Sequence, residues 1–219
     1  MIYYKDGAKM MRPIHNREEY LKLRDSEEQQ SVVRAVRNGN AQLKSRLIQM
    51  NYSCLPNEDG SLKGSTTMSN SVGMDIDHIP PEEMQPLKER ILAKKDELGL
   101  QMMEMSARGG GYHLAFKRKP ELSQEENLQW ASELLGVEFD KGAKDITRVF
   151  FTTTASGENL LYLDDEIFKI EEQGAGSEGQ EDTLLVRDSK HNIPRAPCPS
   201  PLAPQEYNGL PYSDIISKW

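Results

Sequence analysis

Two aspartates at alternate positions, Asp75 and Asp77, are the residues of this sequence best suited to chemistry. They lie in the segment 71–79, whose alternation of apolar and polar residues predicts a strand. Side chains at alternate positions of a strand point to the same face, so the two carboxylates would repel each other unless a cation lies between them. Carboxylate oxygens suit Mg²⁺ or Mn²⁺, whose coordination is commonly completed by substrate phosphates. The pattern therefore predicts a divalent-metal site.

Further polar residues extend this pattern. A predicted strand over 112–117 places His113 and Lys117 on one face, and downstream Asp140 adds a third carboxylate and Arg148 a further cation. Three carboxylates with a histidine and two cations suit nucleotidyl transfer, in which metal ions stabilise the attacking and leaving oxygens while cations hold the triphosphate.

Each of these residue types also has a purely structural explanation. A pair of alternating aspartates is often only a solvated strand face, and an isolated histidine is commonly structural. The segment Arg108–Gly111 can be a flexible turn, although its glycines also let the backbone approach a ligand closely. His78 could ligate the same metal, but strand alternation puts it on the buried face and favours a structural role. The order and spacing of the whole set favour the metal site.

Apolar periodicity and the positions of proline and glycine predict the elements that position these residues. They follow the order β-α-β-β-α-β of the split βαβ, ferredoxin-like unit, in which the first and third strands are neighbours and the fourth flanks the first. The two helices would cover the apolar face and leave Asp75, Asp77, His113 and Lys117 together on an open face. The predicted elements are strands over 71–79, 100–106, 112–117 and 147–153, with helices from Pro80 to Gly99 and from Ser123 to Gly136.

The ends of the chain differ in composition from this central part. Residues 1–50 predict a short strand at 2–4 followed by mainly helical structure, which gives an α+β fold class with an N-terminal helical extension. Residues 171–206 are acidic and rich in glycine and proline, so we expect a flexible linker. Residues 207–219 look like the start of a further helical element. One folded domain is thus expected over 1–170.

Composition limits the classes of protein to which the chain can belong. With 37% hydrophobic and 28% charged residues it can bury a core. No apolar run reaches the roughly 18 residues of a membrane span and no signal-peptide pattern is visible, so we expect a cytoplasmic protein without membrane contact. Two cysteines exclude a disulfide scaffold and a Cys-rich zinc site. The net charge of -8 argues against a general nucleic-acid coat, while the basic run 31–46 leaves room for a local phosphate-binding patch.

Three short motifs in a fixed order carry a resemblance to a known superfamily. Asp75-Ile-Asp77, Gly111-Tyr-His113 and Phe139-Asp140, followed by Arg148, resemble the signature of archaeo-eukaryotic-type primases and primase-polymerases. More narrowly, the stretch from Lys44-Ser-Arg-Leu to Gly73-Met-Asp-Ile-Asp-His-Ile is similar to the VirE N-terminal domain family of bacterial mobile elements. The similarity covers about residues 40–170.

The resemblance implies a palm-type catalytic domain with an RRM-like or ferredoxin-like sheet. Such a domain joins nucleoside triphosphates on a single-stranded nucleic-acid template, here in the replication of a mobile element, and uses Mg²⁺ or Mn²⁺. Family members often continue into a helicase or helical primase domain, which would fit a chain that is a fragment. The implied metal ligands are Asp75, Asp77 and Asp140, and the residues implied to bind the nucleotide are His113, Gly111, Lys117 and Arg148.

Two departures from the family pattern leave alternatives open. Many primases carry a Cys/His zinc module, and this sequence has none. Asp145 also competes with Asp140 as the third acid; we prefer Asp140 because it directly follows an aromatic residue and leaves Arg148 as a separate triphosphate contact.

The competing functions are a catalytically inactive, primase-like nucleic-acid-binding module and another palm enzyme, such as a nucleotide cyclase or a rolling-circle nickase. The nickase is disfavoured because its His-hydrophobic-His pair does not occur.

Overall fold

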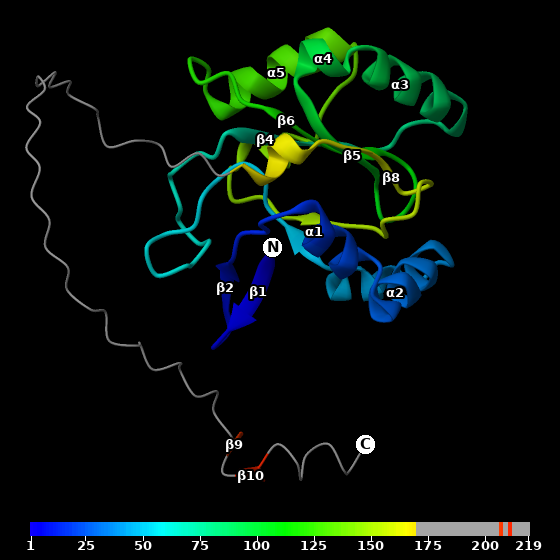
Figure 1. Ribbon diagram of the computed structural model, residues 1–219. Helices are drawn as coiled ribbons and strands as arrows, with labels where there is room; N and C mark the ends of the chain where they lie inside the picture. The colour runs from blue at the N-terminus through cyan, green and yellow to red at the C-terminus, as the bar shows by residue number, and fades with distance from the viewer. Residues whose placement is uncertain (170–205, 208–209, 212–219) are drawn as a thin grey trace, which may run out of the picture. The chain divides into compact units, whose positions relative to one another are not determined.

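The computed structural model describes residues 1–169, 206–207 and 210–211 (Figure 1). The chain divides into two units, 1–173 and 174–219. The expected linker over 171–206 lies almost wholly outside the described residues, as does most of the expected element over 207–219. Within the second unit the described residues form two short antiparallel strands, β9 (Glu206–Tyr207) and β10 (Leu210–Pro211).

The first unit is α+β and contains a four-stranded antiparallel sheet with the order β4-β6-β5-β8. The predicted pairing of the first and third strands is confirmed: β4 and β6 are neighbours, with Asp75 opposite His113. The predicted order of elements from the first strand to the second helix is also confirmed, although the first helix is divided in two at Lys94. The elements are β4 (Ser71–Ile76), α3 (Pro81–Ala93), α4 (Lys95–Leu98), β5 (Leu100–Met105), β6 (Tyr112–Lys117), α5 (Gln124–Leu135) and β8 (Leu160–Leu163).

The predicted fourth strand over 147–153 is wrong. Only β7 (Phe150–Phe151) is extended there, and it pairs with β3 (Gln49–Met50) in a different sheet. The fourth strand of the central sheet is β8, which lies beside β5 and not, as expected, beside β4. The physical reason lies in Asn51, whose side-chain amide donates to the carbonyls of Ile146 and Arg148 at 2.7 and 2.9 Å. These carbonyls are therefore bound by a side chain, and in the described part of the chain no strand pairs with the outer edge of β4.

The N-terminal part is less helical than the sequence predicts. Two expected features are confirmed, the first strand and the helix that Asn16 caps by accepting from the Glu19 amide. The structure adds strands that pair in the order β2-β1-β3-β7, and a second helix that Ser26 caps. The elements of this part are β1 (Ile2–Lys5), β2 (Ala8–Met11), α1 (Arg17–Arg24), α2 (Glu27–Arg37) and the 3₁₀ helix η1 (Ala41–Arg46).

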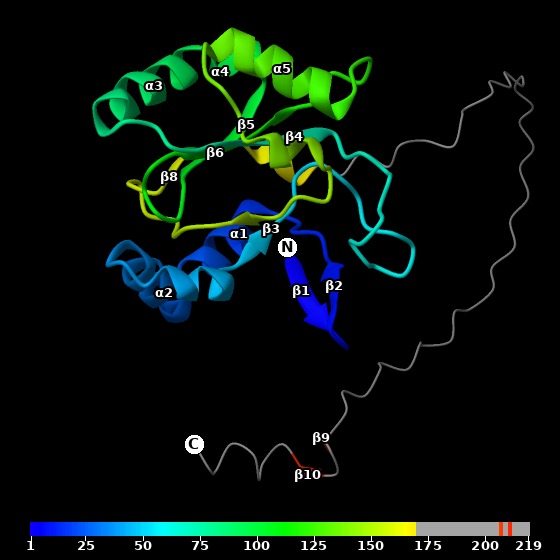
Figure 2. The ribbon, with the colours of Figure 1, turned by 180° about the vertical axis from the view of Figure 1, so that it is seen from behind.

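The β4-β6-β5-β8 sheet is buried on both faces, which corrects the expectation of an open face. Helices α3, α4 and α5 cover one face, and the N-terminal elements lie on the other (Figures 1 and 2). Under the helices, Val72, Met74 and Ile76 pack in the largest hydrophobic cluster. On the opposite face, Ala115 and Met102 pack with Tyr20, Met50, Tyr52 and Phe150. The face that carries Asp75 therefore lies between two layers.

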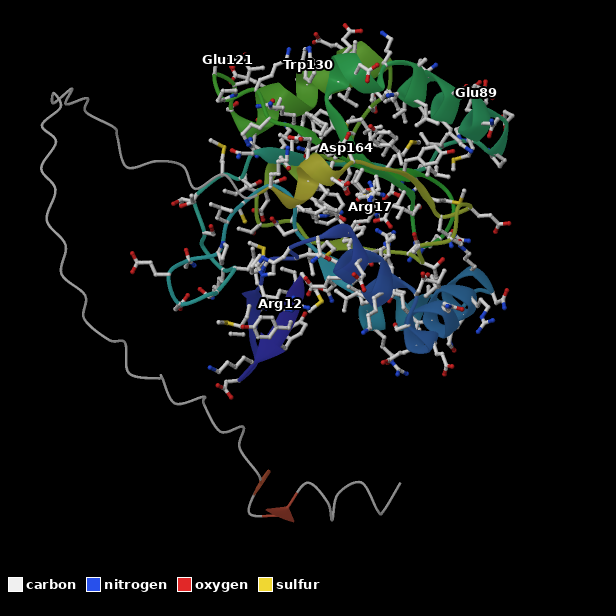
Figure 3. The ribbon with its side chains drawn as sticks, viewed as in Figure 1. Arg12, Arg17, Glu89, Glu121, Trp130 and Asp164 are labelled. Carbon is white, nitrogen blue, oxygen red and sulfur yellow. The ribbon has the colours of Figure 1, made fainter. Side chains whose placement is uncertain are left out.

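Hydrogen bonds at the surface connect the two layers. Arg17 of α1 donates to the Asp165 carboxylate and to the Leu163 carbonyl, both at 2.8 Å, and so joins α1 to the end of β8, close to Asp164 (Figure 3).

The α5 boundaries follow the sequence prediction, because Ser123 and Glu126 form a capping box and Gly136 ends the helix at φ 59°. Among the described residues no helix is long and apolar enough to span a membrane.

Gly111 is required by a close approach between two backbones. A Cβ at this position would lie 2.0 Å from the Ile76 carbonyl oxygen and 3.0 Å from the Asp77 Cα. The neighbouring Gly110 carbonyl accepts from the Ile79 amide at 3.0 Å, which holds the β5–β6 turn against the end of β4. The turn that the sequence presents as flexible is thus packed beside the two predicted catalytic aspartates.

We expect Gly111→Ala to lower the free energy of unfolding by about 1–3 kcal/mol, because its methyl group cannot fit without moving the end of β4. Gly110→Ala is the matched control, since nothing lies within 4 Å of a Cβ there, and it should change stability by less than about 0.5 kcal/mol. Urea unfolding of both variants measures the difference. Equal stability of the two variants would contradict the close approach.

Candidate metal centre

The three predicted carboxylates come together at the end of β4. Asp75, Asp77 and Asp140 each offer one oxygen, and the three oxygens lie within 4.8 Å of one another. Asp75 is the innermost, at 5% exposure, while Asp140 is half-buried and Asp77 is exposed. The Asp140 amide donates to the Asp75 carbonyl at 2.8 Å, so the backbone itself holds the two segments together.

The geometry favours Asp140 over Asp145 as the third acid. Asp140 precedes the 3₁₀ helix η2 (Lys141–Lys144) and caps it, with its Oδ1 accepting from the Gly142 amide at 2.8 Å. Asp145 lies at the other end of η2, where its carboxylate accepts from the amide and the hydroxyl of Thr147, both at 2.8 Å. Asp145 is thus used in a turn and does not belong to the cluster.

Arg148 bridges two of the carboxylates. Its Nη2 donates to Asp140 Oδ2 at 2.8 Å and to Asp75 Oδ2 at 3.2 Å, and its side chain is 36% exposed. Gly142 makes room for it, because a Cβ there would lie 2.4 Å from Arg148 Nη1. The sequence predicts a triphosphate contact for Arg148; in this structure it neutralises part of the carboxylate charge.

His113 is buried between two acids in one cross-strand row. The strand register places Asp75 of β4 and Glu104 of β5 on either side of it. His113 Nδ1 lies 3.2 Å from Glu104 Oε1, and Nε2 lies 3.6 Å from Asp75 Oδ1. Burial would lower the pKa of His113, but the hydrogen bond to Glu104 and the charges of Glu104 and Asp75 raise it above its ordinary value.

The buried ion pair Arg24–Glu104 was not predicted from the sequence. Both side chains are fully buried, and Glu104 Oε2 accepts from Arg24 and from the amide and hydroxyl of Thr153. Burial would raise the pKa of Glu104, but the Arg24 charge and the hydrogen bonds from His113 and Thr153 lower it to about 2. The sequence does hold an indication of this pair, because Glu104 lies in the apolar segment 100–105 and a buried acid on a central strand needs a partner.

Asp75 provides the observation that favours a bound cation. Its Oδ1 is buried and has no hydrogen-bond partner. Burial raises the pKa of Asp75, as does the Asp77 charge, while the His113 and Arg148 charges oppose the rise. A divalent cation would supply the missing partner for Oδ1 and favour the ionised carboxylate, and an all-oxygen donor set suits Mg²⁺ or Mn²⁺. The residues present therefore fit such an ion.

Two residues do not lie where the sequence predicts. Lys117 is exposed and pairs with Ser71 at the opposite end of β4 from Asp75, so the structure does not bring it to the carboxylates. His78 is exposed at φ 60° and not buried, because the strand ends at Ile76 and alternation no longer applies beyond it. Gly111 lies against the Ile76 carbonyl, beside the cluster.

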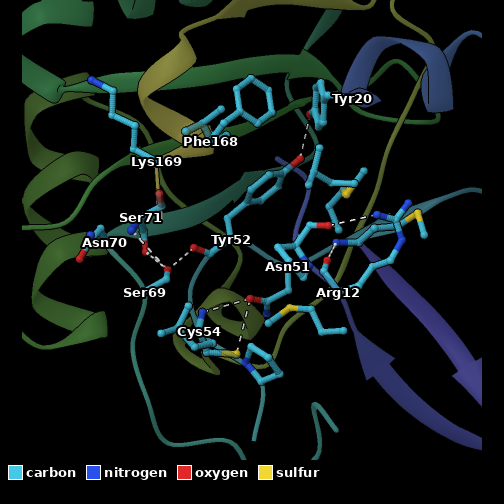
Figure 4. A pocket seen from close by; sticks show the side chains of 18 of the residues that line it. Arg12, Tyr20, Asn51, Tyr52, Cys54, Ser69, Asn70, Ser71, Phe168 and Lys169 are labelled. Carbon is cyan, nitrogen blue, oxygen red and sulfur yellow. Dashed lines mark hydrogen bonds between the residues drawn. The ribbon is translucent and has the colours of Figure 1, made fainter. Parts of the chain in front are cut away.

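The described residues form a cavity at each end of β4. An open groove of about 520 Å³ runs beside Asp77 and Asp140 and gives solvent access to the cluster; its other lining residues are His78, Ile79, Val137, Glu138 and Phe139. A second cavity, of about 450 Å³, is mainly apolar and lies between the N-terminal elements and the start of β4 (Figure 4). In that cavity the hydroxyls of Tyr20 and Tyr52 are hydrogen-bonded at 3.2 Å, and none of its lining residues belongs to the cluster.

No protein-family model matches the sequence, and the comparisons with curated proteins and with solved structures find no match. The chemical interpretation of the site therefore depends on its geometry.

The low pKa of Glu104 predicts a specific acid sensitivity. A carboxyl group whose folded pKa is below its ordinary value of 4.5 contributes stability that is complete above pH 4.5 and is lost as the pH falls toward 2. We expect this group to account for a loss of roughly 3 kcal/mol over that window. Urea unfolding from pH 5.5 downward measures it. The variant Arg24→Met/Glu104→Leu should show a shallower dependence, and an unchanged slope would refute the assignment.

Competition between Arg148 and a cation gives a second prediction. Arg148→Gln removes a positive charge from two carboxylates, so Mn²⁺ should bind roughly fivefold more tightly, which corresponds to about 1 kcal/mol. Lys144→Gln is the control, because it removes the same charge from a nearby exposed pair with Glu125. Isothermal titration with Mn²⁺ compares the two. Weaker or unchanged binding by Arg148→Gln would show that the arginine and the cation do not compete.

Proposed function

We propose that this protein is a divalent-metal-dependent nucleotidyltransferase of the primase-polymerase type, which adds nucleotides on a single-stranded nucleic-acid template. The observation that supports this most directly is the buried Asp75 Oδ1, which lacks a hydrogen-bond partner within a cluster of three carboxylates. An orphaned buried oxygen costs stability unless something binds it. A cation-binding function gives this oxygen a partner.

In this proposal Asp75, Asp77 and Asp140 hold Mg²⁺ or Mn²⁺. The bound metal would activate the attacking hydroxyl and offset the charge that develops on the phosphates. Asp75 holds its place from the protein interior, whereas Asp77 and Asp140 line the open groove through which a triphosphate could enter. The substrate thus meets the two outer carboxylates first.

In this proposal Arg148 also binds the phosphates of the substrate, in addition to its hydrogen bonds to Asp75 and Asp140. A cation held by Asp75 and Asp140 would weaken the attraction of these carboxylates for the guanidinium, which could then donate to phosphate oxygens. Its partial exposure leaves room for such a movement. Gly111 supports the site differently, by allowing the β5–β6 turn to lie against the end of the strand that carries Asp75.

The biological setting is part of the proposal. The resemblance of the motifs to primase-polymerases of the VirE N-terminal domain type suggests a palm-type domain that replicates a bacterial mobile element in the cytoplasm. A helicase or helical primase domain would be its natural partner.

One observation favours a second candidate function. Because Arg148 already neutralises two of the carboxylates, the sheet could persist as a catalytically inactive nucleic-acid-binding module. Such a module would not bind Mn²⁺ through Asp75, Asp77 and Asp140. Metal affinity therefore separates the two functions.

Substitution of each cluster acid tests the proposal. In Asp75→Asn, Asp77→Asn and Asp140→Asn, we expect Mn²⁺-dependent incorporation of labelled nucleotides on single-stranded DNA to fall roughly a hundredfold or more, because each change removes a charge that holds the metal. The three variants should stay folded, because Asn has nearly the same size and shape as Asp and each change removes one of three like charges, while Arg148 keeps a carboxylate partner in every variant. Product length on a denaturing gel and the melting temperature are measured together.

Asp145→Asn is the matched control, because it changes a carboxylate five positions from Asp140 that serves only the turn at Thr147. It should keep wild-type activity. Wild-type protein with neither a Mn²⁺-induced rise in melting temperature nor nucleotide incorporation would contradict the proposed function. Binding of single-stranded DNA alone would then favour the inactive module.

A further inference from the structure

A buried row of alternating charges lies behind the three carboxylates. It runs from Arg24 through Glu104 and His113 to Asp75, and the last three are cross-strand neighbours on β5, β6 and β4. We infer that Glu104, held by Arg24, is a positioning residue that orients His113 so that His113 fixes the Asp75 carboxylate as a metal ligand. This inference rests on the metal site of the proposed function.

Glu104 itself is held in one orientation. Its Oε2 accepts from Arg24 and, at 2.9 Å each, from the amide and the hydroxyl of Thr153, which leaves Oε1 directed at His113. An ionised carboxylate only accepts hydrogen bonds, so the proton between the two groups lies on His113 Nδ1. The protonation of that nitrogen and the direction of the ring are therefore set by Glu104.

The imidazole ring is also confined by packing. Phe150 packs against it in a T-shaped arrangement, with ring centroids 5.4 Å apart. Phe150 in turn occupies the space over Gly73, where a Cβ would lie 2.6 Å from its ring. With Nδ1 bound to Glu104, the only ring nitrogen left is Nε2, which faces Asp75 Oδ1 at 3.6 Å. His113 thus contacts the same oxygen that has no hydrogen-bond partner.

Stability alone does not account for the Arg24–Glu104 pair. A fully buried ion pair repays little more than its own desolvation, and apolar residues of similar volume often replace one at no cost. Arg24 is further anchored by Tyr20 and Thr153, and the Tyr20 hydroxyl continues to Tyr52 in the second cavity (Figure 4). These contacts hold Arg24, and through it Glu104, in the orientation that binds His113. Residues outside the ligand shell commonly orient metal ligands in this way.

A pair of double variants isolates the hydrogen bond to His113. Arg24→Met/Glu104→Gln and Arg24→Met/Glu104→Leu both remove the buried charges, but only the first keeps an acceptor for Nδ1. We expect the Leu variant to bind Mn²⁺ about tenfold or more weakly than wild type, and the Gln variant to stay within about threefold of wild type. Affinity is measured by the electron paramagnetic resonance of free Mn²⁺, alongside the melting temperature of each metal-free protein.

Two results would overturn the positioning role: Mn²⁺ affinities equal to wild type in both variants, or equal losses in both. If wild type adds nucleotides and the variants show either pattern, the inference fails and the proposed function stands. If the two variants show the expected Mn²⁺ affinities but wild type adds no nucleotide, the proposed function fails and the positioning role stands.

A measurement on the wild type covers the case in which the double variants do not fold. A His Nδ1–H that is held by a buried carboxylate should give a slowly exchanging low-field proton resonance that persists when Mg²⁺ is added. Substitution of His113 by Gln identifies the signal. A wild-type spectrum without this resonance, or its loss on Mg²⁺ addition, would contradict the inference.

Discussion

The burial of the Asp75 carboxylate is the constraint on which the rest of the structure depends. A carboxylate placed between two layers is costly unless charges and hydrogen-bond donors surround it. Here the β4–β6 register places His113 beside Asp75, and Arg148 donates to Asp75 Oδ2. His113 is itself buried and is balanced by Glu104, which Arg24 balances in turn. Each of these charged side chains is compensated by the next, and Asp75 Oδ1 still has no hydrogen-bond partner.

The same constraint explains why the covering layer matters for chemistry. The N-terminal elements bring Arg24 and, through the β3–β7 pairing, Phe150 onto the face that carries Asp75. They also exclude water from His113 and Glu104, which strengthens the electrostatic coupling along the row. The outer carboxylates stay accessible from the groove. The site therefore combines buried, hydrogen-bonded residues on its inner side with carboxylates open to solvent on its outer side, as a metal site that exchanges substrates requires.

Much of the central sheet was predictable from local sequence patterns. Strand alternation placed Asp75 on the same side as His113, the Ser123 capping box marked the start of α5, and an aromatic neighbour favoured Asp140. The pairs that were missed depend on distant residues: Glu104 and Arg24 lie 80 positions apart. The failed strand over 147–153 has the same origin, because the Asn51 side-chain amide binds the carbonyls of Ile146 and Arg148 at the start of that segment. Local periodicity carries no information on such contacts.

The central claim is that Asp75, Asp77 and Asp140 together bind a divalent cation, and anomalous diffraction from crystals grown with Mn²⁺ tests it most directly. We expect an anomalous difference peak in contact with all three carboxylates, with Asp75 Oδ1 among the ligands and the Arg148 guanidinium moved away from Asp75 and Asp140. A map without a peak at this position, with Arg148 still bridging the two carboxylates, would contradict it.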